Sequence, residues 1–115
     1  MAVFRYNETI KLKKNVEVFL EITHPTVGTA SHTIIDIPGD NDMETTNEKK
    51  MLLGKGDFLL SERTIIYTKA INMDENNQNV QVHYSINNKT IIEHINPKSI
   101  DPSPQIKINL KFIEL

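Results

Sequence analysis

Apolar and polar residues alternate along much of this 115-residue chain. Residues 16–22, 80–86 and 106–112 each carry an aliphatic or aromatic side chain at every second position, with mostly polar residues between them. A period of two matches a β-strand, whose successive side chains point to opposite faces, and differs from the 3.6-residue period of a helix. The three segments are therefore predicted to be strands with one buried and one exposed face, as in antiparallel sheets.

Further strands are expected at residues 33–37, 63–71 and 90–95. Residues 9–13 precede the strand at 16–22 by a short link, and this spacing predicts a hairpin between the two. A weaker strand is expected at residues 51–53 or 58–60, and residues 38–50 are predicted to be mainly loop. The 16 Ile residues favour an all-β structure, because β-branched side chains suit a pleated surface better than a helix.

Turn residues separate these strands. Asn87 and Asn88 stand between two β segments and predict a two-residue turn, because Asn tolerates the positive φ that such turns need. The proline-rich residues 96–104 form a loop long enough to carry the last strand from one sheet to another. Seven to nine short strands in one domain, residues 1–115, predict an antiparallel β-sandwich of immunoglobulin-like type. A small closed β-barrel is the alternative, since it also buries one face of every strand.

Charge and composition narrow the range of functions. The net charge of −2 gives no strong basic field, so binding to nucleic acid is not expected. No run approaches the roughly 18 apolar residues of a membrane span. The chain has no Cys, and its first residues lack the pattern of a secretory leader. A full-length chain is thus expected to be cytoplasmic or exported without a leader, whereas removal of a leader reverses that expectation.

Two sets of residues are candidates for metal binding. A two-residue turn at residues 87–88 places His83 and His94 diagonally on one polar face, which offers two imidazole ligands. Asp40, Asp42 and Glu44 offer carboxylates at alternate positions, as calcium loops do, although the EF-hand frame fails here. A structural zinc site usually has four ligands, and fewer can be named here. Both sets are therefore expected to be ordinary solvent-exposed polar residues, and no cofactor is predicted.

Residues for catalysis are sparse. The chain has no cysteine nucleophile, no Gly-x-Ser-x-Gly turn and no dinucleotide fingerprint, and Ser31 and His32 are neighbours without a visible third partner. The sequence therefore predicts that this protein is not an enzyme.

Three apolar residues depart from the alternation. Phe19, Ile34 and Ile113 each fall on the polar face of a predicted strand. If they lie together, they form an apolar patch with a polar rim, which is typical of a partner-binding surface. We therefore expect a non-enzymatic interaction or assembly module that contacts another protein, or itself, through a sheet face, an edge strand or its end loops. A small-ligand module that binds calcium or carbohydrate through the acidic loops is the alternative.

Overall fold

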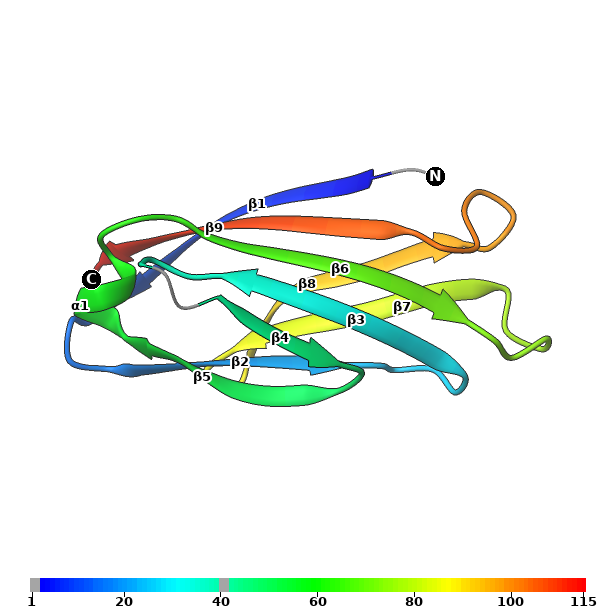
Figure 1. Cartoon of the computed structure of the whole chain (residues 1–115), viewed down its shortest axis with the longest axis horizontal. Helices are drawn as coiled ribbons and strands as arrows, with labels where there is room; N and C mark the ends of the chain where they lie inside the picture. The colour runs from blue at the N-terminus through cyan, green and yellow to red at the C-terminus, as the bar shows by residue number, and fades with distance from the viewer. Residues whose placement is uncertain (1–2, 40–41) are drawn as a thin grey trace.

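Two stacked sheets make up this protein in a computed structural model that describes residues 3–39 and 42–115 (Figure 1). The five-stranded sheet contains, in spatial order, β1 (Val3–Leu12), β9 (Gln105–Glu114), β6 (Thr64–Asn72), β3 (Thr29–Asp36) and β4 (Met43–Thr46). The four-stranded sheet contains β5 (Lys49–Lys55), β2 (Glu17–Thr23), β7 (Asn79–Ile86) and β8 (Lys89–Pro97). One helical turn, α1 (Gly56–Leu59), links β5 to β6. The prediction of an all-β sandwich is confirmed, and the alternative of a closed barrel is wrong for the strands described.

The core lies between the sheets and is built by the alternating residues. Leu20 and Ile22 of β2 face inward from one sheet, and Ile106 and Ile108 of β9 face inward from the other; all four are fully buried. Each such side chain contributes roughly 1.5–3 kcal/mol through removal from water. The period of two thus decides which face of each strand is covered.

A chain of buried hydroxyl groups crosses this core. Tyr84 of β7 donates to Oγ1 of Thr68 on β6 at 2.7 Å, and Thr68 lies 2.9 Å from Oγ1 of Thr33 on β3. All three residues are fully buried, and burial raises the pKa of Tyr84, so its hydroxyl stays protonated. The bond from Tyr84 to Thr68 therefore joins the two sheets within a core that is otherwise mainly aliphatic.

The first strand forms a different pairing from the predicted hairpin. β1 lies in the five-stranded sheet and runs parallel to β9 over the whole of its length, from Val3 opposite Gln105 to Leu12 opposite Glu114. The link at residues 13–16 crosses between the sheets instead of folding back within one. Alternation along residues 9–13 indicates a strand, but it carries no information on which strand will be the partner.

Residues 38–60 also differ from the prediction. Met43–Thr46 forms the edge strand β4 where a loop was expected, and the predicted weak strand at residues 51–53 extends to Lys49–Lys55. An edge strand is paired on one side only and needs few apolar residues, so β4 lacks the apolar alternation by which the other strands were predicted. Residues 58–60 belong mainly to α1, so the second option for the weak strand is wrong.

Two predictions about connections are confirmed. Asn87 and Asn88 have φ values of 48° and 67°, and they form the turn between β7 and β8. Residues 98–104 carry the chain from β8 in one sheet to β9 in the other. No helix in the described part of the chain has the length and apolar character needed to cross a membrane.

Candidate partner-binding groove

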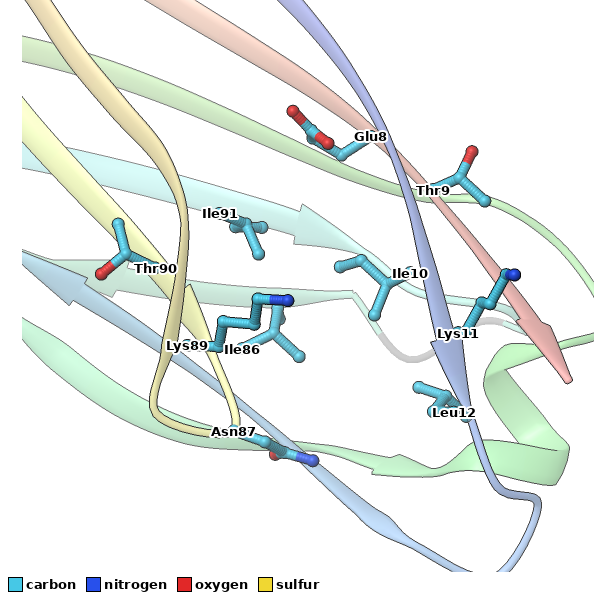
Figure 2. Close-up of a pocket in the computed structure, with 10 residues that line it drawn as sticks. All are labelled: Glu8, Thr9, Ile10, Lys11, Leu12, Ile86, Asn87, Lys89, Thr90 and Ile91. Carbon is cyan, nitrogen blue, oxygen red and sulfur yellow. The ribbon is translucent and has the colours of Figure 1, made fainter. Parts of the chain in front are cut away.

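A groove of about 580 Å³ lies on the side of the sandwich where the edge strands β1 and β8 face each other (Figure 2). Strand β1 ends the five-stranded sheet and β8 ends the four-stranded sheet. Ten residues of β1 and the β7–β8 hairpin line the groove: Glu8, Thr9, Ile10, Lys11, Leu12, Ile86, Asn87, Lys89, Thr90 and Ile91. The groove is thus bounded on both sides by strands that have no neighbour on their outer edge among residues 3–39 and 42–115.

The alternation along β1 builds one wall of this groove. Figure 2 shows Glu8, Ile10 and Leu12 on the side of β1 that faces the hairpin, whereas Thr9 and Lys11 point away from it. Ile86 and Ile91 approach from the opposite wall, so aliphatic side chains form the floor. Ile10 and Ile91 are only partly buried, which leaves apolar surface accessible from the groove.

A partly buried hydrogen-bond network closes one end of the groove. The hydroxyl of Tyr6 on β1 lies 2.6 Å from Nδ1 of His94 on β8, and the ring of Phe4 packs edge-on against the same imidazole. Nδ2 of Asn96 donates to the carbonyl oxygens of Pro97 and Asp101, which turns its Oδ1 toward His94. Nε2–H of His94 therefore donates to Oδ1 of Asn96, and Nδ1 accepts a hydrogen bond from the Tyr6 hydroxyl.

The environment of this network keeps the imidazole neutral. His94 is fully buried, and loss of hydration lowers its pKa, while the bond to Asn96 acts weakly in the opposite direction. Burial likewise raises the pKa of Tyr6. Two neutral partners thus hold the two sheets together just beyond the groove.

Two charges of opposite sign stand in the groove without partners. Glu8 interrupts the apolar inward face of β1, and Lys89 projects from the start of β8. Both are exposed, and within residues 3–39 and 42–115 neither forms an ion pair or a side-chain hydrogen bond. Their free charges are available to a bound molecule.

The predicted apolar patch does not form as a single surface. Phe19 lies on the outer face of the four-stranded sheet, whereas Ile34 and Ile113 lie on the outer face of the five-stranded sheet. Those faces point in opposite directions. Ile34 and Ile113 are also separated along the sheet, because Ile34 is level with Lys107 of β9, and six residues of a strand span about 20 Å.

Each of the three residues has local neighbours of its own. Phe19 is half-buried beside Leu52 of β5, with Nζ of Lys50 5.6 Å from its ring centre. Ile34 is 42% exposed, and Ile113 is half-buried beside Lys11. A role for any one of them in partner binding remains a prediction.

The structure separates the two predicted histidine ligands. A bulge shifts the β7–β8 register, so that Tyr84 pairs with Ile92 although Ser85 pairs with Thr90. The extra residue, Ile91, turns every later side chain of β8 to the opposite face from the one predicted. His94 is therefore buried in the core opposite Val82, and His83 stays on the outer face. The predicted diagonal pair is wrong.

The predicted acidic ligands are only partly described. Asp40 lies outside the described residues, Asp42 is exposed, and Glu44 binds Nε2 of His32 across the β3–β4 pair. In the parts of the chain that the structure describes, no three His, Asp or Glu side chains are grouped as metal ligands. The carboxylate of Glu44 is thus engaged by a neighbouring imidazole in this structure.

Ser31 has a different histidine partner from the one next to it in sequence. Its Oγ lies 2.7 Å from Nε2 of His24, while the side chain of His32 is on the outer face with Glu44. Ser31 is buried; its backbone N–H donates to Oδ1 of Asn47 at 3.0 Å, and the backbone N–H of Asn47 donates to the carbonyl oxygen of Ser31 at 2.7 Å. Burial lowers the pKa of His24, with Glu48 opposing that shift. The hydrogen bond between His24 and Ser31 thus joins the residue after β2 to the start of β3.

Sequence reasoning missed the groove because it began the first strand too late, at Thr9 instead of Val3. Residues 4, 6, 10 and 12 are apolar or aromatic and share the parity of Glu8, so extending the alternation back to Phe4 places Glu8 on the inward face. A charged residue at an inward-facing position was the sequence feature that could have indicated the β1 wall of the groove. The β8 wall had no such feature in the sequence, since it depends on the bulge at Ile91.

Comparison with known proteins gives no relative. No family model matches the chain, and neither the curated proteins nor the solved structures contain a match. The geometry of the groove is therefore the basis for assigning a function.

Proposed function

We propose that this protein is a non-enzymatic interaction module that binds an extended segment of another protein in the groove between β1 and β8. The observation that carries the proposal is the aliphatic floor of Ile10, Ile86 and Ile91 between two unpaired strand edges. Edge strands offer unpaired backbone N–H and C=O groups, and an added strand pairs with them.

The shape and chemistry of the groove favour an extended segment over a compact ligand. Its long walls are strands, and a segment in the β conformation presents every second side chain to the same face. Partly exposed Ile10 and Ile91 would contact those side chains and lose their exposure to water. Backbone pairing then supplies affinity, and the floor supplies selectivity for aliphatic residues.

We further propose that the sandwich is of immunoglobulin-like type. The order β9-β6-β3-β4 corresponds to strands G, F, C and C′ of a variable domain, and the neighbours β2 and β5 correspond to B and E. The β7–β8 hairpin is then an insertion between F and G that occupies the place of strand A beside B. On this interpretation the inserted hairpin forms one wall of the groove and β1 forms the other.

Selection from a displayed library of random twelve-residue peptides tests the binding function. The wild-type protein is expected to enrich peptides with alternating aliphatic residues. Ile91→Asp should weaken the binding of these peptides about tenfold or more, because it places a charge on the groove floor. The exposed rim residue Thr90, changed to Arg, is a second blocking variant that leaves the core intact.

Ile95→Asp is the matched control. Ile95 lies on the same strand, β8, but is 55% exposed outside the groove. Equal weakening by Ile91→Asp and Ile95→Asp would contradict the proposal, as would selected peptides that bind the groove variants as well as the wild type. Failure to enrich any peptide would also count against it. Thermal unfolding of each variant shows that it is folded.

A further inference from the structure

The two unpaired charges in the groove lie at different places along it. Glu8 stands on the β1 wall, two residues after Tyr6 and so next to the end that Tyr6 and His94 close. Lys89 stands on the opposite wall, next to the turn at Asn87, and Figure 2 shows the aliphatic side chains of Ile10 and Ile86 beside it. A segment lying along the groove would therefore meet a negative charge near the closed end and a positive charge near the hairpin turn.

Both charges lie beside apolar surface, which makes their pairing selective. An exposed ion pair contributes little, but a bound segment would cover the floor and remove water around both groups. A like charge placed against either group would then cost free energy. Glu8 and Lys89 have no competing partner within the described residues, so each can form an ion pair with a residue of opposite charge on the bound segment.

We propose, resting on the function proposed above, that the groove selects a segment with a basic residue toward Glu8, an acidic residue toward Lys89 and an aliphatic residue between them. Alternate residues of an extended chain point to one face and are separated by about 6.6 Å. The three side chains therefore fall at alternate positions of the partner segment, and the shortest such arrangement is i, i+2 and i+4. The aliphatic residue rests on Ile10, Ile86 and Ile91.

Charge reversal in the groove tests this specificity. The same library of random peptides is selected against four proteins: the wild type, Glu8→Lys, Lys89→Glu and the double variant Glu8→Lys/Lys89→Glu. Peptides from the wild type are expected to carry a base and an acid around an aliphatic residue. The double variant, which has the same net charge as the wild type, is expected to enrich the inverted order.

Affinity measurements on synthetic peptides make the test quantitative. The best wild-type peptide should bind Glu8→Lys about tenfold more weakly, and replacement of its basic residue by Glu should restore the binding. Glu93→Lys and Lys111→Glu are matched controls, since these residues are exposed and do not line the groove. They should leave the charge pattern of the selected peptides unchanged.

The outcomes separate this inference from the function on which it rests. If all four proteins enrich aliphatic peptides with the same charge pattern, the charge specificity is wrong and the peptide-binding function stands. If the controls change the pattern as much as the groove variants do, long-range charge explains it and the inference is also wrong. If the wild type enriches no peptide, both proposals are overturned.

Discussion

The hydroxyl of Tyr6 lies 2.6 Å from Nδ1 of His94, and this hydrogen bond joins the edge strands of the two sheets. It forms at the closed end of the groove, where the rings of Phe4 and Tyr6 both meet the imidazole edge-on. Beyond it, toward Glu8 and Leu12, no other side-chain hydrogen bond joins β1 to β8 in the described residues. This bond thus marks the end of the groove at which β1 and β8 are joined, and the groove extends from there toward Leu12.

Stability should fall as the pH is lowered below about 6.5. Burial lowers the pKa of His94 and of His24 below the ordinary value of 6.5, so the unfolded chain binds protons more readily than the folded one. The stabilising effect of the neutral rings is complete above pH 6.5 and is lost as the pH falls below it. The slope is at most about 1.4 kcal/mol per pH unit for each histidine.

Urea unfolding between pH 8 and pH 5 measures this slope. His94→Gln should reduce the loss of stability on acidification, and His83→Gln, on the outer face, is the matched control. An identical pH profile for the wild type and His94→Gln would show that His94 does not contribute.

Tyr84→Phe should lower the free energy of unfolding by about 1–2 kcal/mol. The change removes the hydrogen bond to Thr68 and leaves a gap in a fully buried chain of hydroxyl groups, although Thr68 keeps its bond to Thr33. Chemical denaturation gives the difference from the shift of the midpoint at constant slope.

Tyr67→Phe provides the comparison for this variant. Tyr67 donates to Gln105 on the outer face of the five-stranded sheet and is only half-buried. Its replacement should cost less than that of Tyr84, and equal costs would argue against a special contribution from the bond across the core.

Gly56→Ala should destabilise the protein by about 1–3 kcal/mol. An added Cβ would lie 2.3 Å from the carbonyl oxygen of Lys13 and 2.5 Å from Cδ1 of Leu12, so the turn between β1 and β2 must move. The turn cannot yield freely, because the amides of Gly56 and Asp57 donate to the carbonyl oxygens of Val16 and Lys14.

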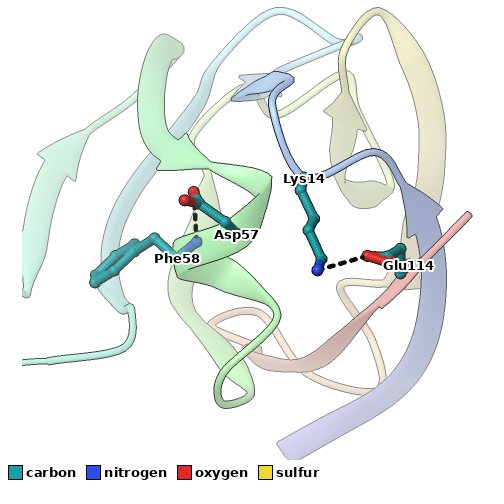
Figure 3. Close-up of polar contacts among 4 residues, drawn as sticks. All are labelled: Lys14, Asp57, Phe58 and Glu114. Atoms are coloured by element: carbon teal, nitrogen blue, oxygen red, sulfur yellow. Dashed lines mark hydrogen bonds and ion pairs between the residues drawn. The ribbon is translucent and has the colours of Figure 1, made fainter.

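Lys14→Ala is the control in the same turn. Lys14 pairs with Glu114 at 3.2 Å, and the backbone N–H of Phe58 donates to Oδ1 of Asp57 nearby (Figure 3). Both charged side chains of the pair are more than half exposed, so its loss should change the stability by less than about 1 kcal/mol. A larger effect than that of Gly56→Ala, in thermal or urea unfolding, would contradict the steric explanation.

Asn72→Ala should loosen two loops at the end of the sandwich opposite α1. The Asn72 amide donates to the carbonyl oxygen of Val27 at 3.0 Å and accepts from the amide of Asp74 at 2.9 Å. Asn72 is buried, so its loss should cost about 1–3 kcal/mol. Hydrogen exchange should become faster at Met73 and Asp74, and the exposed Asn76, changed to Ala, should leave it unaltered.

The sequence by itself determined the clearly alternating strands β2, β7 and β9 and their buried faces. The alternation at residues 80–86 and 106–112 is sufficient because an inward face must be apolar whichever strand lies beside it. The turn at Asn87 and Asn88 is a local property too, since it depends on the tolerance of Asn for positive φ. The change of sheet before β9 follows from a loop too long and too rich in proline for a hairpin.

Only the tertiary structure decided the partner of each strand and the register after Ile91. The pairing of β1 with β9 joins residues about 100 positions apart, and alternation is the same for any partner. A bulge adds one residue to one strand, which buries His94 and frees one wall of the groove. Such a shift depends on the packing of the opposite sheet, so local sequence carries no signal for it. The groove, with Glu8 and Lys89 on its two walls, follows from this long-range pairing and register.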